Sequence, residues 1–449
     1  MSTVAETVDV VVAGGGMAGL CAGLAAAEAG ARVLVMEKGV APGGSMRMSG
    51  GTVWTAPTMA VMERWAPGGD PARQRLLVEG IDDGLAWLAA HGIPRTFDID
   101  NPRQTGAGID VEVMTSGLVA AIASRGGEVR TRAVLRGIVR GEDGGVTGVV
   151  ADMVGRRTTV AARAVILATG GYGGNKELVA RYITPHPETM LLRANPRSVG
   201  DGLLAALDAG ARTSANLATF YGHTMPASPA ELPPATWVAA TAYYTQDAVL
   251  LDERGERFFD ESISMADEQA PARIARRPGG RAVVILDDRV YRNKAGAEQS
   301  PTEVASNWDR AAAAGAPHAI ADTLEELAAA IGGWGFSPVG ALATLRAYNA
   351  AIAAGTSADL SVPRRGNLIG VVRRPFRALA VRAGITFTLG GIDTDVRMRV
   401  LDRDGEPIAG LYAAGADAGG TYQGGYMGGL VLGLVHGRIA GSGAAAHGR

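Results

Sequence analysis

One tyrosine near the C-terminal end of the sequence stands among glycines. The stretch GGYMGG, Gly424 to Gly429, places Tyr426 where the backbone is able to approach a flat or charged group closely. A phenol has a pKa near ~10, so at neutral pH it is first a hydrogen-bond donor and suits a carbonyl oxygen. The apolar run Leu430 to Ile439 predicts a helix that begins beside this phenol with its positive end. Tyr426 is therefore a candidate for chemistry, and the alternative is that it only packs against a bound group.

A second group of glycines opens the chain. The β-branched run Val8 to Ala13 predicts a buried strand, and the Ala-rich segment Met17 to Ala29 predicts a helix. A G-x-G-x-x-G pattern, made by Gly14, Gly16 and Gly19, begins after the strand and extends into the helix. A further strand, ARVLVME, ends at Glu37, whose carboxylate suits ribose hydroxyls. Strand, glycines, helix and acid in this order are typical of a dinucleotide site, with the diphosphate at the helix N-terminus.

The residues after Glu37 favour FAD over NAD. Two more glycine pairs follow, Gly43-Gly44 and Gly50-Gly51, in EKGVAPGGSMRMSGG. A plain NAD domain has no use for a second glycine-rich loop here, whereas the ribityl chain and fused rings of a flavin do.

Length and composition limit the remaining possibilities. A chain of 449 residues predicts two or three domains. Its 43 basic and 45 acidic residues give no basic stripe, so nucleic acid is not an expected partner. The single cysteine, Cys21, fits a reducing compartment, and no metal site is expected. The start has no signal-peptide pattern, and glycines and Glu28 interrupt the run Val10 to Met36, so we expect a cytoplasmic protein without a membrane span.

Seven sequence blocks in a fixed order carry a resemblance to a known family. They are the segment from Gly14 to Glu37, GGSMRMSGG, RAVILATGGYGGNKELVARY, SVGDGLLAALDAGA, LDERGERFFDE, GITFTLGGI and GEPIAGLYAAGADAGG. In this order they resemble the fumarate reductase and succinate dehydrogenase flavoproteins, a family that also holds 3-ketosteroid dehydrogenases. The resemblance covers nearly the whole chain. It implies an α/β fold, with a Rossmann-like FAD-binding domain and an inserted α+β cap domain.

The resemblance also implies which residues contact FAD. These are Gly14, Gly16, Ala18, Gly19, Glu37, Lys38, Gly44, Ser45, Gly50, Gly51, Val134, Ala168, Thr169, Gly170, Asp201, Asp417, Gly429, Val431 and Leu432. Asp201, between two glycines, is expected in an open turn beside a ribityl hydroxyl. The family has an acid where this chain has Ala416, and Asp417 is the next residue. Members that attach FAD covalently use a histidine near the second glycine loop. This loop has none, so FAD is expected to be non-covalent.

The FAD blocks fall at the two ends of the chain. We expect an FAD-binding domain over residues 1–225 and 366–449, interrupted by a cap or substrate domain over residues 226–365. Within the cap, ADTLEELAAAIG and VGALATLRAYNAAIAAG have helical periodicity and predict paired helices. A cap of this kind is expected to close over the flavin and exclude water.

The family's cationic pocket is altered in this sequence. In the fumarate-reducing members, arginines and histidines bind the substrate carboxylates. At the matching positions this chain has Tyr244, Phe387 and Tyr426, and His223 alone keeps its type. Because a buried dicarboxylate needs paired cations, the expected substrate is a neutral and largely apolar small molecule.

The resemblance to the ketosteroid dehydrogenases gives these residues expected roles. There a tyrosine at the position of Tyr426 holds the substrate ketone, another tyrosine removes a proton, and hydride passes to the flavin. Tyr244 and His223 are the candidate proton acceptors, although each has an alternative role in the core. The first tyrosine of this chain is Tyr172, so the N-terminal tyrosine of the 1,2-dehydrogenating members has no counterpart. Dehydrogenation or ene reduction next to a carbonyl is therefore expected, rather than steroid 1,2-dehydrogenation.

Two other functions stay open on the sequence. One is an organic-acid reductase or dehydrogenase whose cations come from Arg193, Arg197 or Arg382. The other is a non-catalytic flavoprotein that serves as an electron-transfer subunit. Since the chain has no cysteines for an Fe–S cluster, its electron donor or acceptor is expected to be external.

Overall fold

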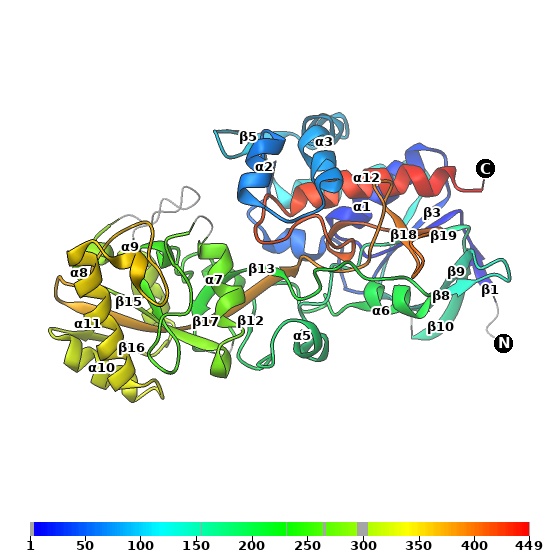
Figure 1. The fold of residues 1–449 in the computed structure, drawn as a ribbon. Helices are drawn as coiled ribbons and strands as arrows, with labels where there is room; N and C mark the ends of the chain where they lie inside the picture. The colour runs from blue at the N-terminus through cyan, green and yellow to red at the C-terminus, as the bar shows by residue number, and fades with distance from the viewer. Residues whose placement is uncertain (1–3, 154, 230, 264–265, 294–303, 449) are drawn as a thin grey trace. The chain divides into compact units, whose positions relative to one another are not determined.

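The computed structural model describes residues 4–153, 155–229, 231–263, 266–293 and 304–448 (Figure 1). The described chain divides into two compact units. Residues 1–178, 194–219 and 387–449 form the first unit, and residues 179–193 and 220–386 form the second. The boundaries expected from the sequence, after residues 225 and 365, both lie inside the second unit.

The first unit contains a six-stranded sheet in the order β18-β19-β11-β2-β3-β7. Its strands are β2 (Val10–Ala13), β3 (Val33–Glu37), β7 (Glu128–Thr131), β11 (Ala164–Leu167), β18 (Arg399–Leu401) and β19 (Pro407–Ala413). All pairs are parallel except β18 with β19. Strand β2 pairs with β3 on one side and with the much later β11 on the other. The chain order therefore reverses between β2 and β11, where open α/β sheets bind their ligands.

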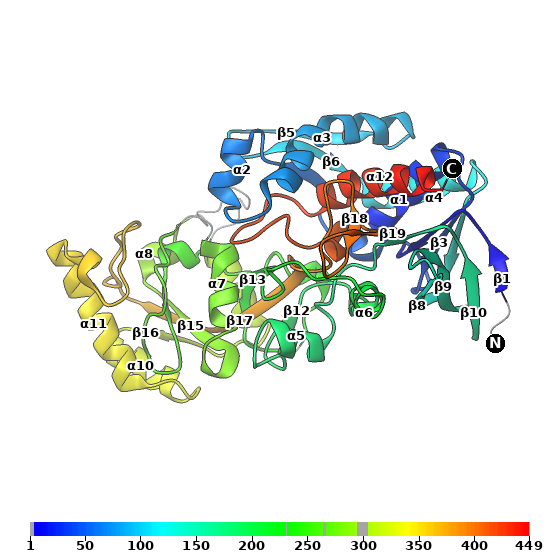
Figure 2. The same ribbon diagram turned by 45° about the vertical axis from the view of Figure 1, so that its right-hand side comes forward.

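Helices and a second sheet cover this central sheet. Helices α1 (Met17–Glu28), α4 (Val111–Ala123) and α12 (Leu430–Ala446) pack on it and on one another (Figure 2). A four-stranded sheet contacts it through β8 (Ala133–Arg140) and β9 (Val146–Met153), and continues through β10 (Arg156–Ala161) to β1 (Val4–Thr7). Helices α1 and α12 pack so closely that a Cβ on Gly441 would lie 2.2 Å from the carbonyl oxygen of Ala22.

A small sheet completes the first unit. It consists of β4 (Thr52–Thr55), β6 (Thr105–Ile109) and β5 (Arg95–Asp100), all antiparallel. Helices α2 (Met59–Trp65) and α3 (Pro71–Ala90) follow β4, and α3 packs on α12. Two short helices lie elsewhere along the chain, α5 (Lys176–Tyr182) and α6 (Asp201–Asp208).

The second unit is built around β17 (Phe376–Thr388). A sheet in the order β12-β17-β15-β14 contains β12 (Leu191–Leu192), β15 (Arg281–Leu286) and β14 (Val249–Leu251). Strands β13 (Phe220–Pro226) and β16 (His318–Ala321) also pair with β17. Alternate residues of β14 and β15 enter two different hydrophobic clusters, so both faces of the sheet are covered.

Helices cover both faces of this sheet. The cluster that contains Leu250 and Val284 includes residues of α7 (Ala266–Ile274), α8 (Asp288–Tyr291) and α9 (Val304–Ala313). The cluster that contains Leu251 and Val283 includes residues of α10 (Leu324–Gly332) and α11 (Pro338–Ala354). The helix pair predicted between the FAD blocks is thus confirmed, and it packs on the sheet of its own unit. The α/β class with a Rossmann-like FAD-binding fold and an inserted α+β unit is also confirmed.

Candidate active site

The first glycine pattern lies at the point where the strand order reverses. A Cβ on Gly14 would lie 2.1 Å from the carbonyl oxygen of Ala168, and a Cβ on Gly19 would lie 1.8 Å from that of Gly14. These two glycines are needed because backbone packs against backbone. Gly16 differs, since a Cβ there would meet nothing within 4 Å. Gly16 is also the N-cap of α1, whose first turn has no side-chain cap and no acidic residue. Open space beside uncapped N–H groups fits the diphosphate of FAD.

The two glycine loops meet at this helix end. Gly43 donates its N–H to the carbonyl oxygen of Gly15 over 2.7 Å, and a Cβ on Gly44 would lie 3.2 Å from the Cα of Gly16. Ser45 follows in the short 3-10 helix Gly44–Met48. A Cβ on Gly50 would also meet nothing within 4 Å.

Glu37 ends β3 and is held by backbone donors. Its Oε2 accepts from the N–H of Gly15 at 3.0 Å, and its Oε1 accepts from the N–H of Gly39 at 2.6 Å. Only 7% of Glu37 is exposed. Each carboxylate oxygen keeps a further lone pair, so Glu37 is oriented and still able to accept from ribose hydroxyls.

Lys38 and Asp201 form an ion pair, with Nζ and Oδ2 2.5 Å apart. Asp201 is the first residue of helix α6, so the expected open turn is wrong at this position. The helix begins here because Gly200, with φ +88°, ends the turn before it. A carboxylate in the first turn of a helix is stabilised by the positive end of the helix dipole.

Asp417 connects two loops of the first unit. Its carboxylate accepts from the N–H of Thr169 at 2.5 Å and from the N–H of Gly171 at 2.9 Å. Burial raises the pKa of Asp417, and these backbone bonds oppose that effect. The same carboxylate explains Gly202, where a Cβ would lie 2.5 Å from Oδ2. We therefore interpret Asp417 as holding the loop after β11, and through it the residues predicted to contact FAD.

Every residue predicted to contact FAD lies in the first unit. Ala18 is in α1, Val134 is in β8, and Ala168 to Gly170 follow β11. Val431 and Leu432 lie in the first turn of α12, which begins at Leu430 after its N-cap Gly429. Among the residues predicted to contact FAD, Gly14, Lys38 and Ala168 directly follow the carboxyl ends of β2, β3 and β11, where an open α/β sheet binds its ligand.

Tyr426 lies in the first unit among aromatic side chains. The ring centroids of Trp54, Phe387 and Tyr422 lie 5.5, 5.8 and 6.0 Å from that of Tyr426, all in edge-on arrangements. The phenol oxygen lies 3.4 Å from the position that a Cβ would take on Gly429, the N-cap of α12. The first turn of α12 has no acidic residue, and Gly429 supplies no side-chain cap. The phenol thus stands at an uncapped helix N-terminus, which favours negative charge.

Two of the glycines around Tyr426 lie against the protein's own backbone. A Cβ on Gly425 would lie 2.0 Å from the carbonyl oxygen of Trp65, and a Cβ on Gly428 would lie 1.9 Å from that of Trp54. These two glycines let the loop press against the protein's own backbone. The sequence analysis missed Trp54 as a neighbour of Tyr426, because only the fold brings its segment close, and it missed Tyr422, which lies four residues earlier in the same loop.

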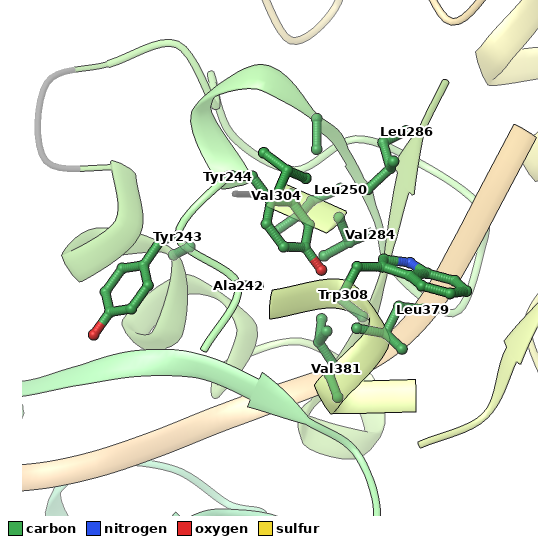
Figure 3. Packing of buried hydrophobic residues seen from close by; sticks show 14 of the residues in the cluster. Ala242, Tyr243, Tyr244, Leu250, Val284, Leu286, Val304, Trp308, Leu379 and Val381 are labelled. Carbon is green, nitrogen blue, oxygen red and sulfur yellow. The ribbon is translucent and has the colours of Figure 1, made fainter. Parts of the chain in front are cut away.

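Tyr244 lies in the core of the second unit. It is 0% exposed, its hydroxyl has no hydrogen-bond partner among the described residues, and burial raises its pKa far above the ordinary value. Its ring lies in the cluster with Val304 and Trp308, and the neighbouring Tyr243 belongs to the same cluster, with its ring on another side of the backbone (Figure 3). This placement argues against Tyr244 as a proton acceptor, because the hydroxyl is enclosed by apolar side chains.

His223 belongs to a separate polar group in the second unit. Its Nε2 lies 2.9 Å from the hydroxyl of Tyr221, and its ring lies edge-on to Tyr221 and Tyr243. Burial, and then the charge of Arg193, lower the pKa of His223 well below 6.5. His223 is therefore neutral at neutral pH, and it contacts a tyrosine that the sequence analysis missed. Tyr221 and His223 are two apart in strand β13, so a period of two was the available signal.

The three arginines considered for an organic acid lie in different surroundings. Arg193 is 9% exposed, donates from Nη1 to the Thr386 hydroxyl at 3.1 Å, and has no partner at Nε within the part of the chain that the structure describes. Arg382 donates to the backbone carbonyls of Thr189, Pro226 and Pro229, which ties it to loop structure. Arg197 is exposed and lies in the first unit.

None of the helices in the described ranges is both long and apolar enough to cross a membrane. Nor do the described histidines, cysteines and carboxylates form a group of three that would hold a metal ion.

Comparisons with known proteins agree with this geometry. The FAD binding domain family matches residues 9–429. A probable fumarate reductase, Ifc3, of Shewanella frigidimarina is 30% identical, over 93% of this chain and 71% of that protein. Vinyl phenol reductase of Lactiplantibacillus plantarum is 28% identical, over 92% of this chain and 90% of that protein.

A solved structure shares the fold. It is 3-ketosteroid-Δ4-(5α)-dehydrogenase from Rhodococcus jostii RHA1 with 4-androstene-3,17-dione, which matches with a TM-score of 0.74 over 99% of this chain and 98% of that one. Because its identity is 24%, this likeness concerns the fold alone. The uncapped helix end at Gly16, the oriented Glu37 and the family match lead to one conclusion. This chain belongs to the FAD binding domain family and is an FAD-dependent oxidoreductase of the fumarate reductase type, acting on carbon–carbon double bonds or the CH–CH groups they form.

Proposed function

We propose that this enzyme transfers a hydride and a proton across a C–C bond adjacent to a carbonyl group, in a neutral and largely apolar substrate such as a cyclic ketone or ketosteroid. Tyr426 is the residue that polarises the substrate carbonyl. Bound FAD supplies the acceptor or donor of the hydride. In dehydrogenation the other hydrogen leaves as a proton to a base, and in ene reduction an acid returns it.

One observation carries this proposal, the position of the Tyr426 phenol at the uncapped N-terminus of α12. A phenol donor and a helix N-terminus both stabilise negative charge on a nearby oxygen. A carbonyl held there becomes enolate-like as its adjacent C–H loses a proton. The hydroxyl of Tyr426 acts as a hydrogen-bond donor to that oxygen.

The side chains around Tyr426 favour an uncharged substrate. Trp54, Phe387 and Tyr422 face its ring, and each presents an aromatic edge or face. A carboxylate placed against them would lose its hydration without gaining a cation, at a cost of several kcal/mol. Vinyl phenol reductase, one of the relatives, is named for a phenol, and phenols are uncharged at neutral pH.

Of the proton-transfer candidates in the second unit, His223 has a hydrogen-bonding partner, and Tyr244 has none among the described residues. The Tyr221 hydroxyl and His223 Nε2 are 2.9 Å apart, a hydrogen bond along which a proton can move. His223 is neutral because burial and Arg193 lower its pKa, so it can accept the hydrogen bond of Tyr221. The chain's single cysteine cannot hold an Fe–S cluster, and we propose an external carrier for the electrons.

The test is anaerobic reduction of the FAD-loaded enzyme by candidate substrates. Saturated cyclic ketones and 3-ketosteroids should bleach the flavin absorbance, whereas succinate at the same concentration should not. If succinate bleaches the flavin and the ketones leave it unchanged, the proposal is wrong.

A second function, dehydrogenation or reduction of an organic acid, is favoured by Arg193. Among the described residues no carboxylate pairs with its guanidinium, although it is 9% exposed. A buried cation without a counter-ion is costly, and a substrate carboxylate would remove that cost. Arg193→Gln should then raise the KM for acids at least ten-fold, about 1.4 kcal/mol. The exposed Arg346, paired with Glu325, provides the charge-matched control Arg346→Gln. An unchanged KM for acids in the Arg193 variant would exclude this function.

A further inference from the structure

Tyr422 closes the loop that carries Tyr426. It is 1% exposed, and its hydroxyl lies 2.8 Å from the carbonyl oxygen of Met427 and 2.9 Å from that of Gly428. One O–H is thus shared by two carbonyls on the far side of Tyr426. A hydroxyl that bridges residues five and six positions later shapes the loop between them.

The backbone of Tyr422 is fixed from the opposite direction. Asn216 donates from Nδ2 to the carbonyl oxygens of Tyr422 at 2.8 Å and Leu389 at 3.2 Å. The Oδ1 of Asn216 accepts from the hydroxyl of Ser214 at 2.7 Å. Asn216 is 5% exposed, so these bonds are shielded from water. Asn216 therefore holds one end of the loop at the Tyr422 carbonyl, and the Tyr422 hydroxyl holds the other end at Met427 and Gly428.

Two further features make the loop a defined support for a phenol. The carbonyl oxygens of Trp65 and Trp54 lie against Gly425 and Gly428, which leaves the backbone little room to shift. Burial, followed by the proximity of Tyr426, raises the pKa of Tyr422 well above its ordinary value. Tyr422 consequently remains a protonated donor over the whole working pH range.

We infer that Tyr422 is a positioning residue for catalysis, which holds the phenol of Tyr426 at the N-terminus of α12 through the carbonyls of Met427 and Gly428. This inference rests on the proposed function of Tyr426. In this role the Tyr422 hydroxyl acts through the loop, by holding the carbonyls of Met427 and Gly428. Since a 1 Å misplacement can cost ~10²-fold in rate, loosening the loop without removing the ring should cost about ten-fold.

The test is a double-mutant cycle on the FAD-loaded enzyme, with Tyr422→Phe, Tyr426→Phe and the double variant. Flavin reduction by a saturating cyclic ketone gives the limiting rate, and its concentration dependence gives the apparent affinity. Tyr412→Phe is the matched control, because Tyr412 is 5% exposed in the same unit and its hydroxyl donates to Gly443 at 3.1 Å.

We expect Tyr422→Phe to lower the limiting rate about ten-fold when Tyr426 is present, and to leave it unchanged when Tyr426 is already phenylalanine. Tyr412→Phe should leave the rate unchanged in both backgrounds. An equal loss in both backgrounds, or no loss in either, overturns the inference for Tyr422. If Tyr426→Phe alone reacts at the wild-type rate, the proposed function has failed instead.

A second variant keeps the test decisive if Tyr422→Phe does not fold. Asn216→Asp retains the acceptor for Ser214 and removes the donor to the Tyr422 carbonyl. Asn216→Asp should also lower the limiting rate only when Tyr426 is present. An equal loss of rate with tyrosine and with phenylalanine at position 426 would also overturn the inference.

Discussion

Replacing Tyr426 by phenylalanine removes one hydroxyl and leaves the ring. The ring keeps its edge-on contacts with Trp54, Phe387 and Tyr422, at centroid distances of 5.5, 5.8 and 6.0 Å, so packing is nearly unchanged. What is lost is one donor placed at the N-terminus of α12. Loss of one such preorganised donor typically costs ~10²–10³ in rate, about 2.7–4 kcal/mol.

The assay is anaerobic stopped-flow bleaching of the flavin by a cyclic ketone. Tyr426→Phe should bind FAD with a nearly unchanged spectrum and bleach more slowly by that factor. Tyr412→Phe serves as the control for removal of a buried hydroxyl in the same unit. A Tyr426→Phe enzyme that holds FAD and bleaches at the wild-type rate would show that Tyr426 only packs.

Three other expectations follow from particular side chains. Glu37→Gln should weaken FAD binding roughly ten-fold in a fluorescence titration, because an amide cannot both receive the N–H groups of Gly15 and Gly39 and accept from ribose; unchanged affinity would contradict this. Tyr244→Phe should keep wild-type activity and melting temperature, since its hydroxyl has no partner, and a large loss of rate would restore Tyr244 as a catalytic candidate. Burial lowers the pKa of His436 to about 3, so the neutral form is favoured by folding and stability is lost as the pH falls from about 6.5 toward 3. Urea unfolding should show that the wild-type protein loses about 2 kcal/mol of unfolding free energy between pH 8 and pH 5 because of His436. The His436→Gln variant should lose less over the same range, and an equal pH dependence in the two proteins would refute the prediction.

The FAD-binding fingerprint was predictable because its signals are local. A buried strand, a glycine pattern and an Ala-rich helix are short-range features, and the observed β2 and α1 differ from the predicted ranges by only one or two residues. Glu37 was placed correctly at the end of β3 for the same reason. The helix after GGYMGG was also predicted, although it continues to Ala446.

Roles that depend on distant backbone were not predictable. Gly425 and Gly428 are glycines because of the carbonyls of Trp65 and Trp54, which the sequence places hundreds of residues away. The burial of Tyr244 follows from helices α7 and α9 packing on β14 and β15, whereas alignment to a pocket motif suggested exposure to substrate. Asp417 was recognised as an unusual acid, but its bonds to Thr169 and Gly171 appear only in the folded chain.

The most direct test of carbonyl-activated chemistry is the reoxidation of the reduced enzyme by two oxidants. The FAD-loaded protein is reduced with one equivalent of dithionite under nitrogen and mixed with 2-cyclohexenone or with fumarate at equal concentration. The aromatic surroundings of Tyr426 predict fast return of flavin absorbance with the enone and slow return with fumarate. Fast reoxidation by fumarate, with the enone inert, would contradict the proposal and assign the enzyme to organic acids.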